Sequence, residues 1–129
     1  KGLKEMKGRS GKPLRIGLLS NAADPEAVRY CIRDMSHLFD TVVISAEAGM
    51  TKPWPEIFQR SLSSMGVPAG SCVYVGDRYM IDVQGALNVG MKAIYTRQYI
   101  TPGEPPENVR IDVPQIRDLS QIPDLLGGI

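Results

Sequence analysis

The sequence predicts an α/β fold in which a mainly parallel, Rossmann-like sheet carries helices on both faces. Short apolar runs rich in β-branched residues alternate with stretches whose apolar residues recur three and four positions apart. Strands that alternate with helices in this way imply right-handed crossovers between parallel strands. The composition agrees, since 43% of the 129 residues are hydrophobic and 22% are charged, as in an ordinary globular domain.

The first half of the chain supplies two predicted strands and two predicted helices. Asp24 and Pro25 are residue types favoured where a helix begins. Pro55 likewise suits a first helical turn, and Gly66 is the residue type that ends a helix. In order, we expect a strand at 14–20, a helix at 24–39, a strand at 41–45, a loop at 47–53 and a helix at 53–65.

The second half of the chain continues the alternation. Further apolar runs predict strands, and a glycine after the intervening helix closes that helix. Three prolines and a glycine within residues 101–108 predict a loop. In order, we expect a strand at 72–75, a helix through 81–87 that closes at Gly90, a strand at 92–96, a short edge strand at 110–113 and a helix at 119–126.

Charge, hydropathy and cysteine usage narrow the function classes. A formal net charge of +1 creates no global field that attracts nucleic acid or an anionic membrane. Five cations fall within residues 1–12 without interleaved aromatic residues, which favours a solvated helix over a nucleic-acid-binding arm. No apolar run approaches membrane-spanning length. Cys31 and Cys72 have no metal-binding spacing, so we expect two reduced core residues in a cytoplasmic protein.

Two carboxylates mark the end of the third predicted strand. Asp77 and Asp82 stand five positions apart where this strand gives way to a helix. A pair of carboxylates in such a place suits a hard cation such as Mg²⁺, which takes oxygen ligands and keeps waters and phosphate oxygens. Either carboxylate could instead cap the helix, and these residues alone leave both roles open.

Two further polar segments follow other predicted strands. Ser20 and Asn21 offer a hydroxyl and backbone N–H groups to an anion, and Lys52 offers an ammonium group that can neutralise a phosphate. Taken singly, these residues also fit a turn and an ordinary solvated lysine. Open parallel sheets bind their ligands beyond the carboxyl ends of the strands, which is where these residues are expected.

Three segments, in this order, resemble the second, third and fourth motifs of the haloacid dehalogenase (HAD)-like hydrolase superfamily. They are residues 18–21, residues 49–58 and residues 75–86, the last containing the Gly-Asp pair and the second aspartate. The resemblance runs from about residue 15 to the end of the chain. It implies that residues 1–129 form a partial HAD-like core domain that carries motifs two to four.

The resemblance also implies a role for each candidate residue. Ser20 would hydrogen-bond the transferring phosphoryl group, with Asn21 beside it in the substrate-binding segment. Lys52 would neutralise both that group and the attacking carboxylate. Asp77 would bind Mg²⁺ directly, and Asp82 would bind it directly or through water. All are electrostatic roles aimed at the charge on phosphate oxygens.

The first motif of that family, an Asp-x-Asp pair, does not occur in this sequence. In the family it ends a central strand and supplies the nucleophile and the general acid. That strand would lie between the strand ending at Ser20 and the strand ending at Asp77. We therefore expect the chain to lack its central first strand and its cap, and to be a fragment of a longer protein. Alternatively, the chain pairs with a segment supplied elsewhere, or it forms a homo-oligomer such as a swapped dimer.

The function expected of the intact protein is a Mg²⁺-dependent phosphatase that acts on a small phosphomonoester. Its aspartyl-phosphate would form on a residue outside this chain, so the chain by itself is expected to be inactive. Dehalogenation is less favoured, because that branch of the family needs no metal and both acidic residues of the fourth motif are present. The absent first motif leaves open a different class: a non-catalytic binding module or the regulatory half of a split enzyme.

Overall fold

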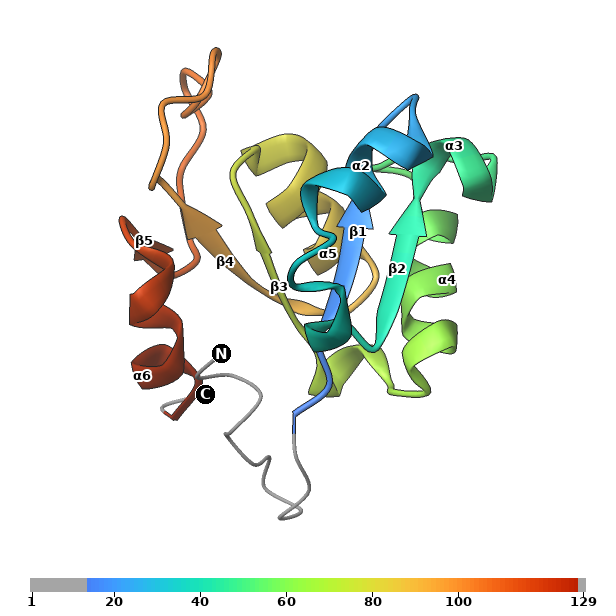
Figure 1. Ribbon diagram of the computed structural model, residues 1–129. Helices are drawn as coiled ribbons and strands as arrows, with labels where there is room; N and C mark the ends of the chain where they lie inside the picture. Colours follow the sequence, from blue (N-terminus) through green and yellow to red (C-terminus); the bar gives the residue numbers. More distant parts are fainter. Residues whose placement is uncertain (1–13, 128–129) are drawn as a thin grey trace. The chain divides into compact units, whose positions relative to one another are not determined.

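The computed structural model describes residues 14–127, which form two compact units that meet in sequence at Gly66 and Val67 (Figure 1). The basic segment predicted to be a solvated helix lies outside the described residues. The predicted α/β class with parallel strands is confirmed in each unit. None of the helices in residues 14–127 has the length and hydropathy needed to cross a bilayer.

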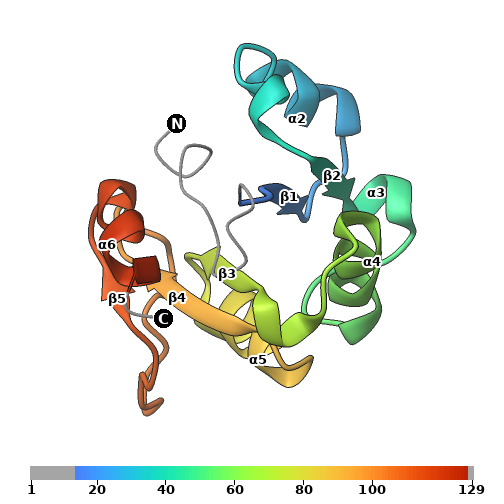
Figure 2. The same ribbon diagram turned by 90° about the horizontal axis from the view of Figure 1, so that it is seen from below.

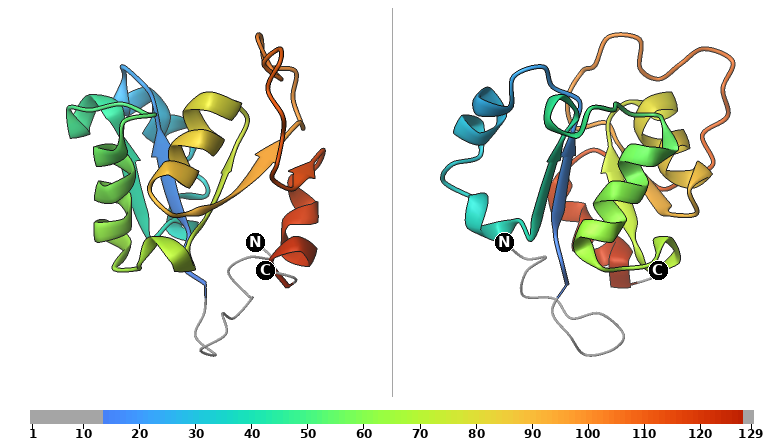
Figure 3. Two further views of the ribbon diagram at one scale, coloured as in Figure 1. Left: turned by 180° about the vertical axis from the view of Figure 1, so that it is seen from behind. Right: turned by 90° about the vertical axis from the view of Figure 1, so that its right-hand side faces the viewer.

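The first unit is built on two parallel strands, β1 (Gly17–Ser20) and β2 (Thr41–Ile44). Their register pairs Gly17 with Thr41 and Ser20 with Ile44, so both strands end at the same edge. Figure 3 shows α2 (Pro25–Cys31) and α4 (Pro55–Met65) on opposite faces of this pair. The carboxyl end of β1 therefore presents Ser20 and the residues after it at one edge of a covered sheet.

Helix α4 supplies most of the packing in the first unit. Ile57 and Phe58 are 0% exposed, which identifies the face that the helix turns to the sheet. A Cβ atom at Gly17 would lie 2.8 Å from the Met65 sulfur, so helix and strand approach closely at this point. Gly66 ends the helix in the left-handed conformation, at φ 69°, as the sequence predicted. The Arg15 guanidinium donates a 2.6 Å hydrogen bond to the Met65 carbonyl there.

The amino end of α4 lacks a side-chain cap. Trp54 occupies the N-cap position and makes no capping hydrogen bond. A Ser, Thr, Asp or Asn at this position usually stabilises a helix by about 1 kcal/mol, because its oxygen accepts a free backbone N–H. The indole is also 65% exposed, so packing does not replace the missing cap.

Three features of the first unit differ from the sequence-based expectation. The helix expected at 24–39 stops at Cys31, and a 3-10 turn, η1 (Ser36–Leu38), follows. No residue of α2 is buried, and a short helix without a packed face gains little stability. The prediction of a core Cys31 is therefore wrong, since this side chain is exposed. The loop expected at 47–53 begins with a helical turn, α3 (Ser45–Ala48).

The second unit is a three-stranded parallel sheet in the order β3, β4, β5. The strands are β3 (Val73–Gly76), β4 (Lys92–Thr96) and β5 (Gln115–Ile116). Figure 2 shows α5 (Gln84–Asn88) and α6 (Ile122–Gly127) on opposite sides of this sheet. Short 3-10 turns, η2 (Ala69–Ser71) and η4 (Leu119–Gln121), precede β3 and α6. Cys72 is half-buried just before β3, and burial raises the pKa of its thiol.

Two elements of the second unit depart from the expectation. The edge strand predicted at 110–113 lies at Gln115–Ile116 instead. Ile116 is the residue that packs into the core, at 1% exposed, and its carbonyl accepts the Arg97 N–H at 2.7 Å. The helix expected through 81–87 begins as a π-helical turn, η3 (Tyr79–Val83), before it becomes α5. A central strand between β1 and β3, expected from the family resemblance, stays a prediction.

Candidate functional site

The first unit brings Ser20, Asn21 and Lys52 together. Ser20 is the last residue of β1, and Asn21 follows it. The Asn21 side-chain amide donates to the Lys52 carbonyl at 3.2 Å, and the Lys52 N–H donates to Asn21 Oδ1 at 2.9 Å. This reciprocal pair joins two loops that are 31 residues apart in the chain. The predicted anion-binding segment and the predicted lysine therefore share one hydrogen-bonded framework.

A buried serine that the sequence analysis did not select fixes the same framework. Ser45 is 6% exposed and follows the last residue of β2. Its hydroxyl accepts the Ala22 N–H at 2.8 Å and donates to the Ala22 carbonyl at 3.1 Å. The loop after β1 is thus held by Ser45 on one side and by Lys52 on the other. The signal available in the sequence was a polar residue at the end of an apolar strand.

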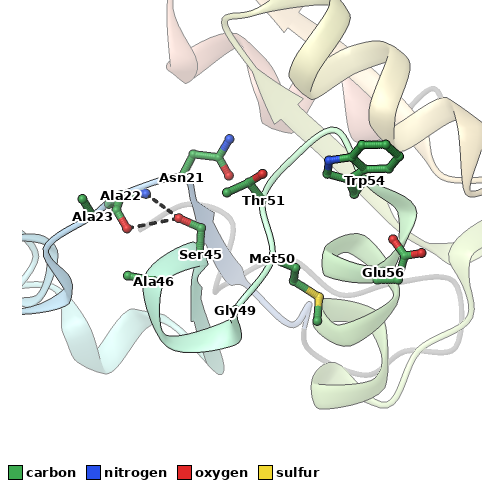
Figure 4. A pocket seen from close by; sticks show the side chains of 10 residues that line it. All are labelled: Asn21, Ala22, Ala23, Ser45, Ala46, Gly49, Met50, Thr51, Trp54 and Glu56. Carbon is green, nitrogen blue, oxygen red and sulfur yellow. Dashed lines mark hydrogen bonds between the residues drawn. The ribbon is translucent and has the colours of Figure 1, made fainter.

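An open hollow of about 820 Å³ adjoins this framework within the first unit (Figure 4). Small residues from the loop after β1 and from α3 form much of its wall. Polar groups come from Asn21, Ser45, Thr51 and Glu56, and Trp54 presents its indole to the same hollow. The residues directly before Asn21 and directly after Thr51 are Ser20 and Lys52, so the rim of the hollow is continuous with the anion-binding candidates.

The second unit positions Asp77 and Asp82 at the carboxyl end of β3. Asp82 is 4% exposed, and its Oδ2 accepts the Arg78 N–H at 3.1 Å. A Cβ atom at Gly76 would collide with the Asp82 side chain and would lie 2.7 Å from Oδ2. Only glycine leaves room for this contact, which explains the Gly-Asp pair at the strand end. Asp77, directly after Gly76, is half-buried.

The turn that carries Asp82 is π-helical rather than α-helical. The Arg78 carbonyl accepts the Asp82 N–H at 2.8 Å and the Val83 N–H at 3.4 Å, and the Gln84 N–H reaches the Tyr79 carbonyl. Widened turns of this kind are rare and often occur at functional sites. Here the turn places the Asp82 carboxylate against Gly76, the last residue of β3.

The loop after β4, orange in Figure 1, also reaches the two-aspartate turn. The Thr101 hydroxyl donates to Asp77 Oδ2 at 3.1 Å. Glu104 Oε1 accepts the Tyr79 N–H and the Tyr95 hydroxyl, each at 2.7 Å. The prolines and glycine of this segment predicted only a loop, and they indicated a role for neither Thr101 nor Glu104. Because Glu104 and Tyr79 are 25 residues apart, no local pattern could indicate their contact.

The buried Tyr95 side chain holds Glu104 through a hydrogen bond. It is 0% exposed and packs edge-on against the Tyr79 ring, with ring centroids 5.5 Å apart. Burial, together with the hydrogen bond to Glu104, raises the pKa of Tyr95 to about 12. The hydroxyl therefore keeps its proton near neutral pH and remains a donor to Glu104.

The two carboxylates fit a hard cation in their chemistry. Both offer oxygen atoms on one short turn, and Mg²⁺ is commonly held by one or two carboxylates with waters and phosphate oxygens completing its shell. Within residues 14–127, no three His, Cys, Asp or Glu side chains gather as a metal cage. Asp77 and Asp82, both in the second unit, are the carboxylates that could contribute to a cation site, whereas Ser20, Asn21 and Lys52 belong to the first unit.

Comparison with known proteins gives a consistent family. A family model described as haloacid dehalogenase-like hydrolase matches residues 1–90. The chain is 36% identical over 118 residues to a glyceraldehyde 3-phosphate phosphatase of Methanothermobacter thermautotrophicus, covering 89% of this chain and 52% of that protein. It is 30% identical over 107 residues to a phosphoserine phosphatase of Thermus thermophilus, covering 82% of this chain and 43% of that protein.

A solved structure shares the fold. The crystal structure of a HAD phosphatase from Thermococcus onnurineus superposes with a TM-score of 0.73 at 26% identity, covering 92% of this chain and 52% of that one. The chain thus spans about half the length of the relatives it matches.

Replacing Gly76 with alanine should destabilise the second unit. The added Cβ must displace Asp82, and overpacking of this kind costs about 1–3 kcal/mol. Urea denaturation measures the change. Gly70→Ala is the matched control, because a Cβ atom at Gly70 meets nothing within 4 Å. Equal denaturation midpoints for the two variants would contradict the close approach of Asp82.

Replacing Glu104 with alanine should lower the free energy of unfolding by about 1–3 kcal/mol, because the Tyr95 hydroxyl and the Tyr79 N–H lose their acceptor. Glu104→Gln keeps an acceptor oxygen and should lose less. The exposed Glu107, on the same loop, provides the control variant Glu107→Ala. If Glu104→Ala unfolds at the same urea concentration as Glu107→Ala, the two hydrogen bonds do not stabilise the unit.

Proposed function

Because the chain belongs to the haloacid dehalogenase-like hydrolases, we propose that it carries the phosphate-holding and metal-holding parts of a magnesium-dependent phosphatase. The substrate is a small phosphomonoester. The reaction passes through an aspartyl-phosphate whose nucleophile lies outside this chain, since the sequence contains no Asp-x-Asp pair. The relatives named as phosphatases support the reaction class.

The reciprocal pair between Asn21 and Lys52 is the observation that carries this proposal. Lys52 supplies a positive charge for the transferring phosphoryl group and the attacking carboxylate. Ser20 donates its hydroxyl to a phosphoryl oxygen. Asn21 contributes its place in the substrate-binding segment and holds the backbone of Lys52. Prior placement of such charges and donors lowers the barrier, because they need no rearrangement as the reaction proceeds.

Asp77 and Asp82 would hold Mg²⁺ in the proposed enzyme. The bound ion supplies positive charge that offsets the charge on the phosphoryl oxygens. The buried Asp82 carboxylate accepts the Arg78 N–H through Oδ2, which fixes its orientation on this turn. Thr101 and Glu104 hold the turn that carries both residues.

Two other functions are separated from this proposal by experiment. A dehalogenase would act without metal, so a magnesium requirement distinguishes it. A non-catalytic binding module or a regulatory half of a split enzyme is favoured by one observation, the absence of an Asp-x-Asp pair from the sequence.

The proposed partners are the segment that bears the nucleophile or a second copy of this chain. We propose a cytosolic location, which suits the free thiols of Cys31 and Cys72.

In the protein that joins this chain to its nucleophile-bearing segment, Asp77→Asn and Lys52→Ala should each lower the magnesium-dependent rate by about 100-fold or more. Each change removes a charge that stabilises the transition state. The assay is phosphate release from acetyl phosphate, with magnesium or with EDTA. The 129-residue chain alone should release phosphate no faster than the protein-free buffer.

Asp112→Asn is the control for this experiment, because Asp112 is exposed in an ion pair with Arg110. This variant should retain the full rate. Full activity in Asp77→Asn or Lys52→Ala, or a rate that EDTA leaves unchanged, would remove the proposed roles. Phosphate release by the chain alone would show that the nucleophile lies within it.

A further inference from the structure

Trp54 is a large apolar residue that is mostly exposed and does not cap the helix it precedes. The residue occupies the N-cap of α4, makes no capping hydrogen bond and is 65% exposed. A smaller polar residue would stabilise the helix more. Residues that violate a local stability rule are concentrated at functional sites. The indole is therefore best explained by contact with a ligand.

The hollow beside Trp54 is connected to the phosphate-holding candidates. Asn21 lies on its wall and is hydrogen-bonded to the Lys52 backbone, and Thr51 directly precedes Lys52. A phosphoryl group held by Ser20 and Lys52 would therefore have the hollow on the side of Asn21 and Thr51. The remainder of a phosphomonoester is the group that this space can accept.

The lining selects the chemistry of that group. Glu56 is the one charged residue among the described residues that line the hollow, so no lysine or arginine is available there to pair with a carboxylate. Hydroxyl groups can bond to Glu56, Asn21 and Thr51, while the C–H face of a polyol can lie against the indole. A carboxylate in this space would face Glu56 with like charge.

We infer that this hollow is the leaving-group site, and that it accepts a neutral, hydroxyl-rich group and rejects one that carries a carboxylate. The inference rests on the proposed phosphatase function and names its substrate class. Trp54 supplies the stacking surface. Glu56 sets the charge preference, in addition to its favourable place in the first turn of α4.

A matched pair of substrates tests the inference in the nucleophile-bearing protein. Glycerol 3-phosphate and 3-phosphoglycerate differ only in a hydroxymethyl group and a carboxylate. The kcat/KM for glycerol 3-phosphate should exceed the kcat/KM for 3-phosphoglycerate by about tenfold or more. Trp54→Ala should raise the KM for glycerol 3-phosphate about tenfold and leave acetyl phosphate, whose leaving group is small, within about twofold. Glu56→Gln should reduce the discrimination about fivefold.

Gln59→Ala is the control variant, because Gln59 is exposed on the same helix and does not line the hollow. A preference for 3-phosphoglycerate, or a Trp54→Ala variant with unchanged KM values, would overturn the inference while acetyl phosphate is still hydrolysed. If the wild-type protein hydrolyses no phosphomonoester at all, the proposed function fails, and the leaving-group site fails with it.

Discussion

The two hydrogen bonds between the Asn21 side chain and the Lys52 backbone are the contact on which the first unit's candidate site depends. They connect the end of β1 to the loop before α4, and they do so through both polar groups of one amide. Ser45 holds the Ala22 backbone in a similar two-way manner. The backbones of Ala22 and Lys52 are thus fixed by side-chain hydrogen bonds. A site that must place charges precisely depends on such a fixed backbone.

In the second unit, close packing positions the candidate aspartates at the end of β3. Gly76 has no Cβ, so Asp82 can fold back over the strand end, and the π-helical turn supplies the extra residue that this path needs. The loop after β4 completes the arrangement, because Thr101 contacts Asp77 and Glu104 bridges Tyr79 and Tyr95. The protonated Tyr95 hydroxyl, buried in the core, ties this surface loop to the sheet.

The sequence was informative wherever one residue type has one physical consequence. The alternation of short apolar runs with helical segments predicted the parallel strands, and Gly66 predicted the end of α4. Periodicity failed at residues 24–39, because an apolar face forms a long helix only where the sheet covers it, and α2 buries no residue. Ser45 and Glu104 were missed because their contacts with Ala22 and Tyr79 join residues more than twenty positions apart. Strand β5 lies where Ile116 is buried, and the local sequence does not show that this residue, rather than residues 110–113, packs into the core.

The proposed phosphatase requires the turn from Asp77 to Asp82 to hold a divalent cation. Manganese(II) can replace magnesium as a paramagnetic probe, and it broadens the amide signals of nearby residues in a ¹H–¹⁵N spectrum of the chain. If the turn binds the ion, the amides of residues 76–83 broaden first, and Asp77→Asn removes this effect. Broadening confined to other acidic residues, such as Asp112 and Asp124, or unaffected by Asp77→Asn, would contradict it.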